Sequence, residues 1–277
     1  MPETTGDRMS ARRRAATSLA ATALVADAAE KLATRGIVVM PVKGALLQHW
    51  LYEDPSERPL TDVDLLVHPR SLQRAAELLE AGGYRRTCHS SVGGIVLRTP
   101  LGLMLDLHSQ LFDRARYRLP TDEVFARSSE DDTLYGTSVR LPAPLDAYAH
   151  LIGKFGSDHL DARSLGRLDE ISRMSARLEA SPKTAARHLV HCGMGRIARY
   201  VLPLVQQTTG DVFALKVYRH LPFDPIGRGV VAIAHPILAA ASPESRAGAL
   251  VAHLLNESLP RGLRSGTRAL IQQLRWS

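Results

Sequence analysis

The stretch Arg58-Pro59-Leu60-Thr61-Asp62-Val63-Asp64-Leu65-Leu66-Val67 joins two acids to a fully apolar run. Its alternation predicts a β-strand over residues 61–67 that becomes buried toward its end. Side chains two residues apart point to the same face of a strand, so Asp62 and Asp64 lie side by side. Neighbouring carboxylates on a buried strand are unfavourable unless a cation lies between them. The stretch therefore predicts a strand whose acidic end holds a cation.

A third acid follows in a later apolar segment. Asp106 interrupts Leu103-Met104-Leu105-Asp106-Leu107-His108, which predicts a second strand. If the two strands are neighbours, Asp62, Asp64 and Asp106 form an oxygen ligand set that suits Mg²⁺ or Mn²⁺ bound together with substrate phosphates. Simpler interpretations stay open, since an acid pair on a strand is commonly solvated and Asp106 also fits a strand end or a helix cap.

The segment before the acid pair predicts a strand over residues 37–42 and a helix from residue 45, joined by Lys43 and Gly44. A small turn that opens a helix N-terminus is suited to binding phosphate, and Lys43 adds a positive charge there. The alternative is an ordinary strand-to-helix turn with a lysine on the surface.

Two further polar residues flank the acids. Arg58 lies four residues before the first acid, where it is expected to pair with a carboxylate or a phosphate. A plain salt bridge with Glu57 or Asp54 is the alternative. His108 follows Asp106 by two residues, so it shares a strand face with that acid and is a candidate to orient metal-bound water or substrate. A structural, hydrogen-bonded histidine is the other interpretation.

The order of elements predicts two different halves. Helices over residues 16–34 and 70–81 and strands near 84–88 and 94–98 complete a sheet domain in the first half, which predicts an α+β class. After Leu141-Pro142-Ala143-Pro144 few strand patterns remain. Helical patterns fall at 144–157, 164–180, 182–193, 195–208, 229–240, 243–257 and 261–275.

These patterns predict three parts of the chain. Residues 1–15 are expected to be a disordered N-terminal arm, residues 16–141 a sheet domain, and residues 142–277 an all-α domain. Residues 209–228 are expected to be a connecting loop or a mobile segment.

Composition excludes several classes of protein. A chain of 277 residues, 45% hydrophobic, can bury a sizeable core without disulfides. Its two cysteines, Cys88 and Cys192, favour a reducing, cytoplasmic setting. The sequence contains no run of about 18 apolar residues, so we expect no membrane span. The net charge of +7 is spread along the chain, and aromatics make up 5%, which argues against a nucleic-acid partner.

The motifs in this order resemble the nucleotidyltransferase superfamily that includes DNA polymerase β. More narrowly, residues 37–110 resemble a bacterial family of uncharacterised nucleotidyltransferases. The matching residues are Val42-Lys43-Gly44, Tyr52, Arg58, Asp62-Val63-Asp64-Leu65-Leu66-Val67, Leu78-Leu79, Gly83-Tyr84 and Asp106-Leu107-His108. The turn departs from the superfamily pattern, because Ala45 follows Gly44 where a serine or a second glycine is usual.

The resemblance implies a small mixed sheet with flanking helices and a magnesium-dependent, pyrophosphate-releasing transfer of a nucleoside monophosphate. It implies that Asp62, Asp64 and Asp106 bind Mg²⁺ or Mn²⁺ and that Asp106 draws a proton from the acceptor. It implies that an NTP such as ATP is the co-substrate, with Lys43, Gly44, Arg58 and His108 around it. The acceptor, a small molecule, peptide or protein, stays open, and tailoring of a peptide or natural product is one implied setting. An inactive, antitoxin-like binding or regulatory protein is the alternative.

Overall fold

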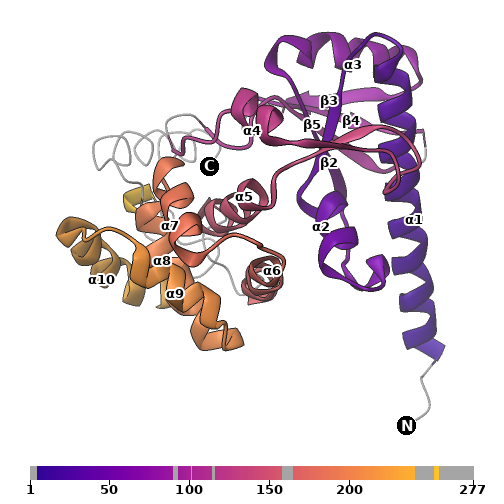
Figure 1. The fold of residues 1–277 in the computed structure, drawn as a ribbon. Helices are drawn as coiled ribbons and strands as arrows, with labels where there is room; N and C mark the ends of the chain where they lie inside the picture. The colour runs from indigo at the N-terminus through magenta and orange to yellow at the C-terminus, as the bar shows by residue number, and fades with distance from the viewer. Residues whose placement is uncertain are drawn as a thin grey trace, which may run out of the picture. The chain divides into compact units, whose positions relative to one another are not determined.

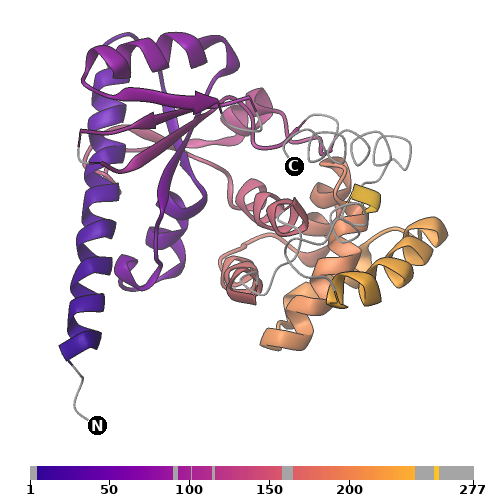
Figure 2. The same ribbon diagram turned by 180° about the vertical axis from the view of Figure 1, so that it is seen from behind.

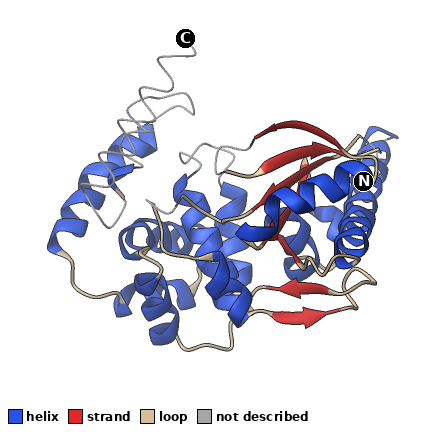
Figure 3. Ribbon diagram, turned by 90° about the horizontal axis from the view of Figure 1, so that it is seen from above, coloured by secondary structure: helices blue, strands red, loops and turns tan. Residues whose placement is uncertain are grey.

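The computed structural model describes residues 5–89, 93–100, 102–113, 116–157, 165–240 and 253–255. The chain forms two compact units. The first comprises Met1–Leu111 and Pro120–Ala143, and the second comprises Phe112–Leu119 and Pro144–Ser277. All of the described strands belong to the first unit, and Figure 3 distinguishes them from the helices by colour.

The first unit has the predicted mixture of helices and strands, which confirms the α+β class. Its helices are α1 (Thr5–Ala33), α2 (Lys43–Leu51), α3 (Leu72–Ala81) and α4 (Thr121–Arg127), with the short 3₁₀ turns η1 (Pro55–Glu57) and η2 (Pro69–Ser71). Its strands are β1 (Val39–Val42), β2 (Asp62–Val67), β3 (Arg85–His89), β4 (Ile95–Arg98), β5 (Met104–His108), β6 (Ser129–Asp131) and β7 (Val139–Leu141).

The main sheet is mixed and has the order β1-β2-β5-β4-β3. Strand β2 pairs parallel with β5, whereas β1–β2, β4–β5 and β3–β4 pair antiparallel. The chain therefore leaves β2, forms α3 and the hairpin of β3 and β4, and returns with β5 next to β2. Strands β6 and β7 form a separate antiparallel ribbon.

The two faces of the β2–β5 pair differ in polarity. One face, here called the apolar face, carries Val63, Leu65, Leu105 and Leu107, each at most 1% exposed. These side chains join one hydrophobic core with residues of α1 and α3. Figures 1 and 2 show both helices alongside the sheet. The opposite face, here called the acid face, carries Asp62, Asp64, Asp106 and His108.

The N-terminal segment differs from its prediction. Helix α1 begins at Thr5, so residues 5–15 are helical where a disordered arm was expected. Arginine and alanine, which dominate residues 11–16, are strong helix formers, and a helix that buries one face from Ser18 onward can propagate back through them. Residues 1–4 lie outside the described part of the chain.

The elements described in the second unit are helices: α5 (Pro144–Ser157), α6 (Leu165–Ala176), α7 (Pro182–His191), α8 (Gly195–Thr209), α9 (Val212–His220) and α10 (Pro225–Ala240). The expectation of a loop over 209–228 is wrong, since α9 and the start of α10 fall there. Asp211 caps α9 by accepting a hydrogen bond from the Ala214 N–H, and Pro225 starts α10. The patterns predicted at 243–257 and 261–275 lie outside the described residues, apart from 253–255.

Among the helices that the structure describes, none combines the length and the apolar character needed to cross a bilayer.

Candidate functional site

The parallel pairing of β2 and β5 brings the predicted acids together. Its register places Asp64 opposite Asp106 and Leu66 opposite His108. Alternate residues of both strands are apolar and turn to the core, so the polar residues between them share the acid face. Two acids that are distant in sequence thus stand on adjacent strands.

Asp64 is the most buried of these acids, with 3% of its surface exposed. Its Oδ1 accepts a hydrogen bond from Lys43 Nζ at 2.5 Å and lies 2.7 Å from His108 Nε2. Burial alone would raise the pKa of Asp64, but the hydrogen bond with His108 and the charge of Lys43 outweigh it and lower the pKa to about 2. Asp64 is therefore a carboxylate at any physiological pH.

The pKa of Asp106 is shifted in the opposite direction. Burial raises the pKa of its carboxyl group; the charge of His108 opposes that rise and the charge of Asp64 adds to it. Its Oδ2 lies 3.2 Å from His108 Nε2. Its Oδ1 is buried and has no hydrogen-bond partner among the residues that the structure describes. Such an oxygen is costly to leave unsatisfied, so it points to a ligand.

Asp64, Asp106 and His108 each offer a ligand atom, and these atoms lie within 4.8 Å of one another. Two carboxylates with one unsatisfied buried oxygen fit a divalent cation such as Mg²⁺ or Mn²⁺. The histidine nitrogen is a softer donor, and its contacts with both carboxylates suit it to orient them. The residues present therefore fit the metal that the sequence implies, although the gathered set differs from Asp62, Asp64 and Asp106.

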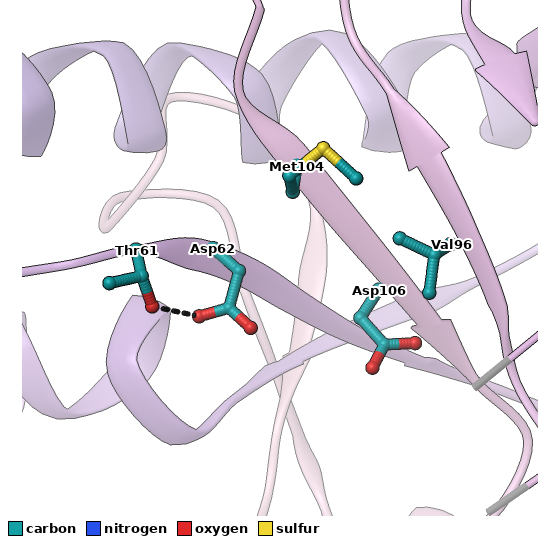
Figure 4. A pocket seen from close by; sticks show the side chains of 5 residues that line it. All are labelled: Thr61, Asp62, Val96, Met104 and Asp106. Carbon is teal, nitrogen blue, oxygen red and sulfur yellow. Dashed lines mark hydrogen bonds between the residues drawn. The ribbon is translucent and has the colours of Figure 1, made fainter. Parts of the chain in front are cut away.

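Asp62 lies at the exposed start of β2, outside that group of three. Its Oδ1 accepts a hydrogen bond from the Thr61 hydroxyl at 2.8 Å. Together with Asp106 it lines a hollow of about 310 Å³, whose other lining residues are Thr61, Val96 and Met104. Figure 4 shows the carboxylates of Asp62 and Asp106 on the same side of the two strands. Asp62 is thus positioned to meet a ligand that enters this hollow.

Lys43 occupies an unusual backbone position. It begins α2 directly after β1 with φ of 50°, the left-handed region that non-glycine residues rarely adopt. Its neighbour Val42 pairs with Asp64 in the sheet, which accounts for the contact between Lys43 Nζ and that carboxylate. Strain of this kind gathers at functional sites. The sequence predicts Lys43 as a phosphate contact, whereas the structure places its ammonium group on Asp64.

Gly44 follows within the first turn of α2 and is approached closely by Arg58. A Cβ at this position would lie 2.5 Å from Arg58 Nη1 and 2.5 Å from Leu60 Cδ2. The absence of a side chain therefore lets the Arg58 guanidinium lie against the helix N-terminus. The structure joins Lys43, Gly44 and Arg58 at this end of β1 and β2.

The sequence did not reveal that Lys43 and His108 converge on one carboxylate. Alternation placed His108 on the face of Asp106, but no sequence pattern states which strand lies beside β5. The antiparallel register of β1 with β2 was equally hidden, and it sets the position of Lys43.

Sequence and structure comparisons relate this chain to nucleotidyltransferases. The family model described as "Uncharacterised nucleotidyltransferase" matches residues 1–210. A crystal structure described as an antigenic nucleotidyltransferase-like protein from Paracoccidioides brasiliensis is similar over 73% of this chain and 94% of that chain, with a TM-score of 0.47 and 17% sequence identity. The search of curated proteins finds no match. Since the family model covers well over half of its length, the chain belongs to this family of uncharacterised nucleotidyltransferases.

Proposed function

We propose that this protein is a metal-dependent nucleotidyltransferase that moves a nucleoside monophosphate from an NTP to a hydroxyl or phosphate of an acceptor and releases pyrophosphate. Family membership supports the reaction class. One observation carries the metal dependence: Asp64, Asp106 and His108 converge, and Asp106 Oδ1 is buried there with no hydrogen-bond partner in the described part of the chain. We assign this activity to a nucleotidyltransferase domain over residues 16–141, followed by a helical domain over residues 142–277.

The acids have different roles, which follow from the direction of their pKa shifts. Bound Mg²⁺ or Mn²⁺ would neutralise triphosphate charge and make the acceptor hydroxyl more acidic. Asp64, whose pKa is lowered to about 2, serves as a permanently charged ligand. Asp106, whose pKa is raised, serves as a ligand and takes the proton from the acceptor. Asp62 faces the same hollow and completes the predicted acidic set.

The cationic residues hold the triphosphate in this proposal. Lys43 leaves Asp64 and binds a phosphate as a point charge. Arg58 binds phosphate through its planar guanidinium group, which lies against the α2 N-terminus at Gly44. His108 keeps the two carboxylates oriented through its contacts with Asp64 and Asp106. The family resemblance implies tailoring of a peptide or natural product as one setting, so the acceptor search includes such compounds.

The test measures pyrophosphate release and transfer of label from α-labelled NTPs, with and without Mg²⁺ or Mn²⁺. We expect the wild-type protein to require the metal and Asp64→Asn to lose more than about 100-fold in rate, because a charged ligand is removed. Asp169→Asn, which changes an exposed acid of α6 paired with Arg173, is the matched control and is expected to retain full activity. Equal rates in Asp64→Asn and wild type would refute the proposal.

A second candidate function, binding without turnover, is favoured by one observation. The Lys43 ammonium group already neutralises Asp64, so an inactive member of the family would keep this ion pair permanently. Electron paramagnetic resonance of Mn²⁺ separates the two functions. An enzyme binds Mn²⁺ in the presence of NTP despite Lys43, whereas a non-catalytic protein binds it only in Lys43→Met and releases no pyrophosphate in either form.

A further inference from the structure

A pair of arginines extends the acid face beyond the metal-site residues. In the sheet register Arg85 of β3 lies opposite Arg98 of β4, and Arg98 lies opposite Met104 of β5. Met104 in turn lies opposite Asp62 of β2. Residues directly opposite each other share a sheet face, so these four form one row across the sheet.

Two neighbouring side chains confirm the direction of this row. Arg86 binds Glu80 of α3, a helix that covers the apolar face, so the adjacent Arg85 points to the acid face. Val96 lines the hollow beside Asp106, and Arg98 follows it by two residues. Both arginines are exposed. Arg98 therefore stands next to the hollow, with Arg85 beside it on the outer strand.

Two like charges placed directly opposite each other destabilise a strand pair. Within the part of the chain that the structure describes, the side chains of Arg85 and Arg98 make no hydrogen bond and no ion pair. Two adjacent guanidinium groups match the oxygens of a phosphate, which they can bind through paired, charge-assisted hydrogen bonds. A bound phosphate would remove their repulsion.

This pair lies on the far side of the acids from the other cations. Lys43 and Arg58 stand at the β1–α2 end, beside Asp64, whereas Arg98 and Arg85 stand beyond β5 on β4 and β3. The acids thus lie between two cationic positions. In the proposed function the first position receives the triphosphate, which leaves the second for another anionic group.

We infer that Arg85 and Arg98 bind a phosphate group of the acceptor, so that the acceptor is a phosphate-bearing small molecule. This inference rests on the proposed function. Arg98 stands two strands from Asp62, about 10 Å away at the usual spacing, so the bound phosphate differs from the reacting group. A hydroxyl oxygen of the acceptor forms the new bond to the α-phosphorus. The bond from that phosphorus to the β-phosphate oxygen breaks, pyrophosphate leaves with the electron pair, and Asp106 takes the hydroxyl proton.

Direct binding of inorganic phosphate is the first test. Titration calorimetry compares wild type with the double variant Arg85→Gln/Arg98→Gln and with Arg74→Gln, which removes an exposed charge on α3. We expect the double variant to bind inorganic phosphate at least about 10-fold more weakly, because charge-assisted bonds are lost, and the control to match wild type. Unchanged phosphate binding in the double variant would overturn the inference. Thermal unfolding checks folding, and the double variant is expected to be as stable as wild type or slightly more stable at low salt.

The second test identifies the acceptor class. Wild type, α-labelled NTP and Mg²⁺ are incubated with a small-molecule cell extract, either untreated or treated with phosphatase that is removed before the NTP is added. We expect labelled product from the untreated extract, a loss of at least about 10-fold after phosphatase, and the same loss in the double variant. Equal labelling of both extracts, or a product sensitive to nuclease, contradicts the inference and leaves the proposed function intact.

A third measurement separates failure of the inference from failure of the proposed function. Affinity for an NTP with Mn²⁺ is expected to be the same in wild type and in the double variant, because the triphosphate is bound at Lys43 and Arg58. A weaker NTP affinity in the double variant would show that the arginines bind the nucleotide, and it would overturn the inference. If no extract is labelled at all, the proposed activity fails, and the phosphate titration alone decides whether the arginine pair is an anion site.

Discussion

The two faces of the β2–β5 pair are built from alternate residues of the same strands, yet they have opposite effects on the fold. The apolar face buries Val63, Leu65, Leu105 and Leu107 in a continuous core. The acid face gathers carboxylates, and one of their oxygens has no hydrogen bond to any described residue; Lys43 and His108 compensate the charge. The comparison shows that stability and chemistry can be separated residue by residue along one strand.

The largest expected effect on stability comes from the apolar face. Leu105→Ala should lower the free energy of unfolding by about 2–5 kcal/mol, because it removes a fully buried side chain and leaves a cavity. Urea denaturation measures the change. Met104→Ala, the adjacent residue on the acid face and only partly buried, is the control and should cost about 1 kcal/mol or less. Similar losses in both variants would mean that the two faces are not separated in this way.

The acid face should make stability depend on pH. The pKa of Asp64 is lowered to about 2 in the folded protein, so between about pH 4 and pH 2 the unfolded chain binds more protons than the native one. Stability from this group is therefore complete above its unfolded pKa and is lost as pH falls through the folded pKa. The contribution at pH 7 is about 2 kcal/mol.

Urea denaturation of wild type and Asp64→Asn between pH 7 and pH 2, with metal removed by a chelator, measures this contribution. The variant should be less stable at pH 7, and the difference should disappear toward pH 2. A difference that stays constant across the whole range would show that Asp64 is not stabilised by Lys43 and His108 in its charged form.

The smallest expected effect comes from a substitution at Gly44, which should change the KM for NTP. Gly44→Ala places a Cβ against Arg58 and Leu60, so the Arg58 guanidinium must move. Alanine favours the helix by up to about 1 kcal/mol, which offsets part of the crowding and keeps the stability close to that of wild type. The KM for NTP should rise roughly tenfold, because a positioned phosphate contact is lost.

Steady-state kinetics tests this expectation against Gly166→Ala. Gly166 also lies in the first turn of a helix, but an added Cβ there meets no atom of the described residues within 4 Å. That control should keep the wild-type KM. An unchanged KM in Gly44→Ala would show that Arg58 does not contribute to nucleotide binding.

Local patterns predict much of this fold. Alternation predicted β2, the apolar run over residues 103–108 predicted β5, and the helical pattern over residues 70–81 predicted α3. The predictions failed where local signals were weak or opposed. Residues 5–15 carry like charges that suggested disorder, yet their helix propensity continues α1. Helix α9 is only nine residues long and rests on its Asp211 cap and on the burial of Ala214 and Val217.

The site could be predicted only as a set of candidates. The spacing of Asp62 and Asp64 fixed their common face, and an acid inside an apolar run singled out Asp106. The meeting of Asp64 with Lys43, Asp106 and His108 depends on strand order and register, which are long-range properties. The left-handed backbone at Lys43 left no sequence signal, because glycine normally marks such a position and here glycine follows one residue later.

The parallel pairing of β2 with β5 also has a consequence for how the chain folds. The hairpins β3–β4 and β4–β5 join neighbouring segments, whereas Asp64 and Asp106 come together only when strands roughly forty residues apart in the chain meet. Contacts of such sequence separation form slowly, because a long loop must close first. During synthesis the carboxylates therefore remain apart until β5 has emerged from the ribosome, and the proposed metal site is complete only once the last strand of the main sheet is made.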